Sequence, residues 1–99
     1  MSKKIINYYK REIVPILKRY QVPKAAFFGS LTRGKFTGKS DVDILVLPPK
    51  GMSFLDFIGL KQDIEDRIRK EVDLVSYNGI SPYIKDSILS GQQVFYETG

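Results

Sequence analysis

Cysteine and histidine are both absent from this chain of 99 residues. Without cysteine there can be no disulfide, which fits a protein of a reducing compartment. Without either residue type the usual zinc sites cannot form, and there is no histidine base and no cysteine nucleophile. Any acid–base chemistry must therefore use aspartate, glutamate, lysine or tyrosine.

Long apolar runs are also missing. No stretch approaches the ~20 apolar residues that a membrane-spanning helix needs, and the start, Met1–Lys4, lacks the apolar core of a signal peptide. We therefore expect a cytoplasmic protein with no membrane contact. The length predicts a single domain over residues 1–99, too short for a second substrate-binding domain.

Negative charge is scarce in the first part of the chain. The net charge is +5, and residues 1–40 contain ten Lys and Arg but one acid, Glu12, whereas residues 41–99 contain six basic and ten acidic residues. The two parts therefore carry +9 and −4. This asymmetry favours an anionic partner such as a nucleotide, a nucleic acid or an acidic protein, although a solvated helix face is the commoner explanation of any single lysine.

The hydrophobic pattern predicts alternating strands and helices. Helical spacing and capping residues predict three helices, at 5–20, 54–68 and 82–91, and short apolar runs predict strands at 25–28, 42–47, 72–77 and 94–96. Pro15 should kink the first helix or break it in two. The alternation is typical of a small α/β domain.

Three aspartates stand in strand contexts. Asp41 and Asp43 are two residues apart at the start of a strand, so their side chains point to the same face. Asp73 lies within a second apolar strand, where a carboxylate is costly unless it has a partner. If these strands are neighbours, the three carboxylates can converge. Oxygen ligands of this kind suit Mg²⁺ ions that hold substrate phosphates.

A glycine–serine turn precedes the paired aspartates. Gly29 allows close approach of a phosphate to the backbone, and Ser30 can add hydrogen bonds from its hydroxyl and from a short helix that starts there. Arg33 could pair with the same phosphates. Ser40 could either bind phosphate or cap a turn. Together these residues favour phosphoryl or nucleotidyl transfer.

Two segments, Phe28–Gly34 (FGSLTRG) and Lys39–Leu45 (KSDVDIL), together resemble the signature of the minimal nucleotidyltransferases, within the polymerase-beta-like nucleotidyltransferase superfamily. The later Asp73 completes the pattern, while Thr32 and Ile44 replace the usual alanine and leucine. The resemblance implies a small mixed β-sheet with helices packed on it.

The resemblance also implies a role for each matching residue. The nucleotide, ATP, would be bound by Gly29, Ser30, Arg33 and Ser40. A pair of Mg²⁺ ions would be held by Asp41, Asp43 and Asp73, and Asp73 would help to deprotonate the acceptor hydroxyl. All three carboxylates of the motif are present, so nothing in the sequence argues against catalysis.

Minimal nucleotidyltransferases resemble antitoxins that act on a helical HEPN toxin. The resemblance therefore implies an enzyme that transfers AMP to a tyrosine of such a toxin within a complex. Candidate contacts with this partner are the tail Val94–Tyr96, Tyr77 and Tyr83, with ordinary core packing as the alternative for each.

Three other functions remain open from the sequence. The chain could neutralise a toxin by binding and masking it, without chemistry. It could transfer a nucleotide to a small molecule, although enzymes of that type carry a further helical domain. Direct nucleic-acid binding through the basic first helix is the weakest alternative, because no aromatic RNA-binding motif is present.

Overall fold

The computed structural model describes residues 2–98, so Met1 and Gly99, the two ends of the predicted domain, lie outside the described residues. Its four strands are β1 (Lys24–Phe28), β2 (Val42–Leu47), β3 (Val72–Ser76) and β4 (Gln93–Glu97). They form one sheet in the order β3–β2–β1–β4. The β2–β3 pair is parallel and the other two pairs are antiparallel. The predicted small mixed sheet is confirmed.

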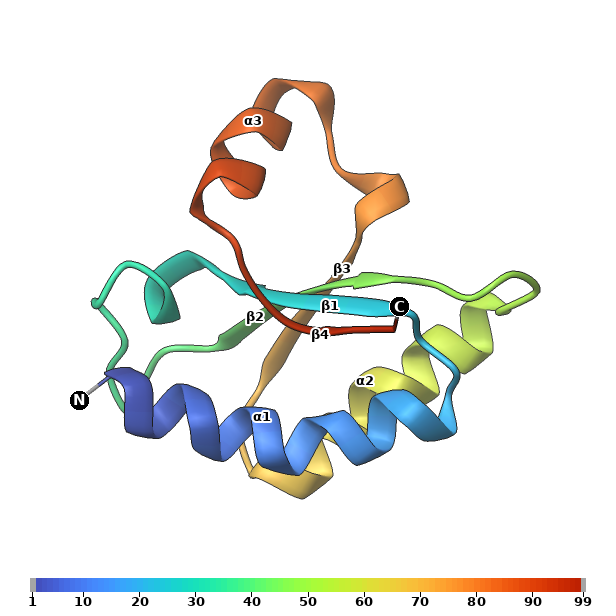
Figure 1. The fold of residues 1–99 in the computed structure, drawn as a ribbon, viewed down its shortest axis with the longest axis horizontal. Coiled ribbons are helices and arrows are strands. Elements are labelled where there is room, and N and C mark those ends of the chain that lie inside the picture. Colours follow the sequence, from blue (N-terminus) through green and yellow to red (C-terminus); the bar gives the residue numbers. More distant parts are fainter. Residues whose placement is uncertain (1, 99) are drawn as a thin grey trace.

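The three helices lie on opposite faces of this sheet (Figure 1). Helices α1 (Ser2–Arg19) and α2 (Phe54–Ile68) cover one face, and α3 (Pro82–Gly91) stands on the other. Two short 3-10 turns, η1 (Gly29–Leu31) and η2 (Tyr77–Gly79), follow β1 and β3. None of the helices within residues 2–98 is long and apolar enough to cross a membrane.

The hydrophobic core lies between the sheet and the pair of helices α1 and α2. Alternate strand residues such as Ile44 and Leu74 point into it, as the two-residue period of a strand requires. Phe27 of β1 stacks on Phe95 of β4 with ring centroids 4.0 Å apart. Phe95 is only 7% exposed, so of the two roles open for it from the sequence, partner contact or core packing, the structure shows core packing.

Of the two effects predicted for Pro15, a kink or a break of the first helix, the break is wrong, because α1 runs unbroken from Ser2 to Arg19. Pro15 lies on the exposed side, and so does Arg11, whose carbonyl loses the bond that residue 15 would otherwise donate. Water can satisfy that carbonyl. The buried stripe on the other side, which includes Ile13 and Leu17, holds the helix on the sheet.

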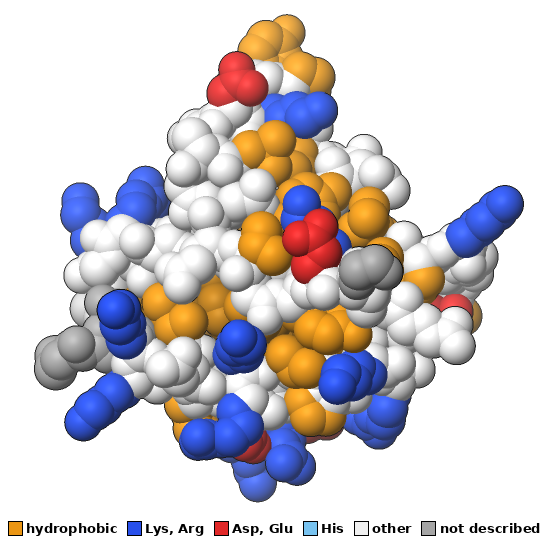
Figure 2. Space-filling model, viewed as in Figure 1, with side chains coloured by type: hydrophobic (Ala, Val, Ile, Leu, Met, Phe, Trp, Pro, Cys, Tyr) orange, Lys and Arg blue, Asp and Glu red, His pale blue; other side chains and the backbone are white. Residues whose placement is uncertain are grey.

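The outward side of α1 is basic. Figure 2 shows lysine and arginine side chains spread over the lower part of the molecule, where α1 lies. Ion pairs are few on this surface: Arg11 and Arg67 both approach Glu12, Arg67 at 2.8 Å. The anionic partner suggested by the charge asymmetry stays a prediction.

Candidate active site

Strand pairing brings two of the three aspartates together. In the parallel register of β2 and β3, Asp43 lies opposite Asp73, and on its other side Asp43 pairs with Phe28 of β1. The flanking residues Val42 and Ile44 belong to the core beneath the sheet. The two carboxylates therefore lie on the opposite face, the one that α3 covers.

The turn after β1 folds tightly around Asp43. Gly29 has a φ of +72°, and a Cβ there would lie 2.9 Å from Cγ of Asp43 and overlap its carboxylate. Both facts require glycine at this position. The backbone N–H of Ser30 donates a hydrogen bond to the Asp43 carboxylate, and the Thr32 hydroxyl donates to the Gly29 carbonyl at 3.0 Å. The turn thus packs against the carboxylate that the sequence places fourteen residues later.

A cavity of about 270 Å³ opens above these residues. It is lined from η1 and the strands by Phe28, Gly29, Thr32, Arg33, Asp43 and Asp73, and from α3 by Ser87, Ile88 and Gly91. Sequence reasoning missed the three α3 residues, since no motif marks them. Only the pairing of β4 with β1, which returns the chain across the sheet, places α3 over the carboxylates.

Asp43 is the electrostatic centre of the cavity. Burial, followed by the negative charges of Asp73 and Asp41, raises the pKa of Asp43 to about 6 from its usual value of 3.8, against the lowering effects of the Ser30 hydrogen bond and the Arg33 charge. The three carboxylates are therefore close enough to repel one another. A bound cation would relieve this repulsion, so the all-oxygen donor set fits a hard divalent ion such as Mg²⁺.

The carboxylates do not yet form a ready ligand cluster. Within residues 2–98 no group of three or more His, Cys, Asp and Glu side chains is arranged to hold a metal ion. Asp43 and Asp73 share the cavity, whereas Asp41 precedes β2 and lies exposed in a neighbouring hollow. The metal assignment therefore stays a prediction.

Ser40 is engaged in a turn and does not line the cavity. Its Oγ accepts a hydrogen bond from the Thr37 backbone N–H at 3.0 Å, and its own N–H donates to the Thr37 carbonyl at 3.0 Å. Of the two roles open from the sequence, the structure shows turn capping. Among the other expected nucleotide-binding residues, Gly29 and Arg33 reach the cavity and Ser30 contributes its backbone.

A larger hollow of about 440 Å³ lies between α1 and α2 and includes Glu12, Arg19 and Arg67. Glu12 and Arg67 are already paired there at 2.8 Å. Asp63 and Asp66 also line this hollow, but its lining residues include no glycine and none from a strand. The smaller cavity at the Asp43–Asp73 pair is the candidate active site, because two neighbouring carboxylates and the Gly29 turn lie there at the ends of adjacent strands.

Comparison with known proteins agrees with this geometry. The sequence matches the family described as Polymerase beta, Nucleotidyltransferase over residues 11–99. A relative from Methanocaldococcus jannaschii, described as a candidate protein adenylyltransferase, is 46% identical over 85 residues, covering 86% of this chain and 91% of its own length. The protein adenylyltransferase MntA of Thermococcus cleftensis is 34% identical over 86% of this chain and 83% of its own.

Solved structures share the fold. One, described as a candidate minimal nucleotidyltransferase, has a TM-score of 0.78 at 26% identity and covers 94% of this chain and 95% of its own. A toxin–antitoxin complex with AMP-PNP has a TM-score of 0.78 at 22% identity, over 90% of this chain and 73% of its own. A tri-AMPylated Shewanella oneidensis HEPN toxin in complex with an MNT antitoxin has a TM-score of 0.72 at 19% identity, over 99% and 74%. At these identities the last two show the fold alone.

Proposed function

The chain belongs to the polymerase beta nucleotidyltransferase family, and from that premise we propose that it is a magnesium-dependent, cytoplasmic antitoxin that transfers AMP from ATP to a tyrosine of a partner HEPN toxin. The observation that carries the proposal is the Asp43–Asp73 pair, which lies across β2 and β3 and opens into the cavity beside Gly29.

The proposed reaction forms one bond and breaks one. The acceptor hydroxyl oxygen attacks the α-phosphorus of ATP, the new O–P bond forms, and the bond from this phosphorus to the β-bridging oxygen breaks, so that pyrophosphate leaves. Asp73 is exposed at the cavity and accepts the proton of the attacking hydroxyl. Arg33, exposed at the cavity rim, pairs with the phosphates of the leaving group.

Asp41 and Asp43, with Asp73, would hold the Mg²⁺ ions. When bound, Mg²⁺ neutralises the charge that develops on the leaving pyrophosphate and lowers the pKa of the attacking hydroxyl. The crowded negative charge around Asp43 provides the driving force for cation binding. The backbone of Gly29 and Ser30 keeps the Asp43 carboxylate in place.

The choice of partner follows from the relatives and structural neighbours. One structural neighbour is an MNT antitoxin in complex with an AMPylated HEPN toxin, and another toxin–antitoxin neighbour was solved with an ATP analogue. In this chain the cavity at Asp43 and Asp73 supplies the nucleotide half of a site. The partner protein, which brings its own tyrosine, completes the acceptor half.

The test is AMP transfer measured on an intact partner. The chain is incubated with ATP, Mg²⁺ and a HEPN-type toxin, and the mass of the toxin is recorded. We expect a gain of one or more AMP units, lost with Asp43→Asn and retained with Asp86→Asn, which changes an exposed acid on α3. A toxin variant with phenylalanine for the acceptor tyrosine should gain nothing.

Two results would contradict the proposal. If wild-type protein adds no AMP but still blocks the toxin, and the Asp41→Asn/Asp43→Asn double variant blocks it equally well, the protein acts by masking. If AMP appears on a small hydroxylated acceptor and never on the toxin, the acceptor class is wrong.

A further inference from the structure

Lys70 joins the loop that carries Asp41 to the segment that carries Asp73. It lies between the end of α2 and the start of β3, and its Nζ donates a hydrogen bond to the Gly38 carbonyl at 2.8 Å. The same Nζ lies 5.0 Å from the centre of the Phe36 ring, within cation–π range. One ammonium group thus holds two points of the loop between η1 and β2.

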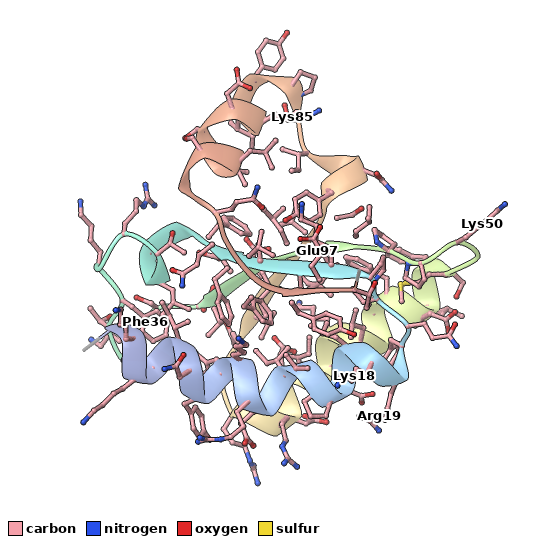
Figure 3. All side chains as sticks on the ribbon, in the orientation of Figure 1. Lys18, Arg19, Phe36, Lys50, Lys85 and Glu97 are labelled. Atoms are coloured by element: carbon pink, nitrogen blue, oxygen red, sulfur yellow. The ribbon has the colours of Figure 1, made fainter. Side chains whose placement is uncertain are left out.

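Apart from the contacts of Lys70, the loop, residues 34–40, is attached to the body of the protein by Phe36, which packs against the core, and by the Lys35 N–H, which donates to the Ser30 carbonyl at 3.0 Å. Phe36 contacts the ring of Tyr9 on α1 edge to face, with centroids 6.0 Å apart, and lies beside the N-terminal part of that helix (Figure 3). Thr37 and Ser40 bond to each other within the loop. A loop with two glycines and this much exposure would otherwise sample many conformations.

The loop ends at Asp41. After Asp41 the chain is fixed again, because the Val42 N–H donates to the Glu71 carbonyl at 3.0 Å. Asp41 is exposed and its side chain lies in the hollow that Gly38, Lys70 and Glu71 also line. The position of this carboxylate relative to Asp43 therefore depends on how firmly the residues just before it are held.

We propose that Lys70 is a positioning residue for the transfer reaction: by binding the Gly38 carbonyl and the Phe36 ring, it orders the loop that ends at Asp41 and so limits how far this carboxylate can move from Asp43, two residues further on. This inference rests on the proposed function for the role of Asp41. Lys70 itself touches neither the cavity nor the phosphates; it acts through the loop. Lys70 also lies three positions before Asp73 in the sequence.

The first experiment tests, without metal or substrate, whether Lys70 orders the loop. Amide hydrogen exchange of Ser40 and Val42 is measured by NMR in wild type, Lys70→Met and the control Lys61→Met, which changes an exposed lysine of α2. We expect about threefold to tenfold faster exchange at these amides in Lys70→Met only, as expected for loss of one exposed hydrogen bond. Unchanged exchange would overturn the proposal.

The second experiment tests positioning. Mn²⁺ binding in the presence of a non-hydrolysable ATP analogue is measured for the same variants, together with kcat and KM for AMP transfer. We expect Lys70→Met to weaken Mn²⁺ binding and lower kcat about tenfold, at the low end of the effects of groups that orient metal ligands, with KM for ATP little changed. Lys70→Arg keeps a charged donor that stacks on rings and should restore most of both.

The outcomes separate this proposal from the proposed function. If wild type transfers no AMP to a toxin, the exchange and Mn²⁺ measurements still decide the role of Lys70. If exchange accelerates in Lys70→Met but Mn²⁺ binding and kcat equal those of Lys61→Met, Lys70 holds the loop without positioning a ligand, and the proposal is wrong.

Discussion

Replacing Asp43 by asparagine should stabilise the metal-free protein while it abolishes transfer. The folded state holds this carboxylate in a partly buried place beside two others, which raises its pKa from 3.8 to about 6. At about 1.4 kcal/mol per pH unit this rise corresponds to about 3 kcal/mol of destabilisation above pH 6. Because the side chain is partly solvated and screened, we expect about 1 to 2 kcal/mol.

The pH dependence gives the sign of the effect. A carboxyl group whose pKa is raised on folding binds its proton more tightly in the folded state, so stability falls as pH rises from 3.8 to about 6. Asparagine carries no charge at any of these pH values. The excess stability of Asp43→Asn should therefore be complete at pH 7.5 and disappear towards pH 4.

The assay is urea unfolding in EDTA at pH 7.5 and pH 4.5, with Asp86→Asn as the control for a change at an exposed acid. The difference between variant and wild type cancels the titration of the other acids. A variant that is less stable than wild type at pH 7.5, or equally stabilised at both pH values, would refute the reasoning from charge repulsion.

Other substitutions test the supporting structure. Gly29→Ala should lower the free energy of unfolding by well over the ~1–2 kcal/mol that a left-handed alanine costs, since the new Cβ would overlap the Asp43 carboxylate. Gly34→Ala, with a φ of +71° and open space around the new Cβ, should cost only that amount. Urea unfolding of both variants compares them, and equal losses of stability would contradict the close packing at Gly29. Ser53→Ala removes the capping box of α2 and should cost about 1 kcal/mol, measured as a lower urea midpoint with normal transfer. Tyr20→Phe removes the 2.5 Å bond to Asp63 that joins α1 to α2 and should cost about 1 kcal/mol, again without loss of transfer; a catalytic defect would show that this joint influences the site.

Local sequence patterns were sufficient to predict those parts of the site that lie on two neighbouring strands. The strand contexts of Asp43 and Asp73 predicted that the two could share a face if their strands were neighbours, and the parallel register of β2 and β3 places Asp43 opposite Asp73. Asp41, which was expected on the same face, precedes β2 and lines a neighbouring hollow. The small mixed sheet was predicted through resemblance and is confirmed. The strands themselves follow from the periodicity of apolar residues, which can be read directly from a sequence.

Features that depend on distant contacts could not be read in this way. The unbroken α1 depends on the packing of its buried stripe, which outweighs the local effect of Pro15. Ser40 had two possible partners, and only the geometry of the turn with Thr37 decides between them. Lys70 and Gly38 are 32 positions apart in the sequence, and no local pattern around Lys70 predicts this contact.

The two walls of the cavity differ in how firmly the fold holds them. The sheet beneath is backed by the core with α1 and α2, whereas α3 above has no buried residue, and its Tyr83 is 97% exposed. Segments with so little burial open by local unfolding at a small fraction of the global free energy. A nucleotide that touches both walls is therefore linked to the order of α3: at a concentration of 100 times its Kd it would suppress this opening by up to about 2.7 kcal/mol. The enzyme can thus admit substrate and release product by loosening a single short helix while the carboxylates below it keep their register.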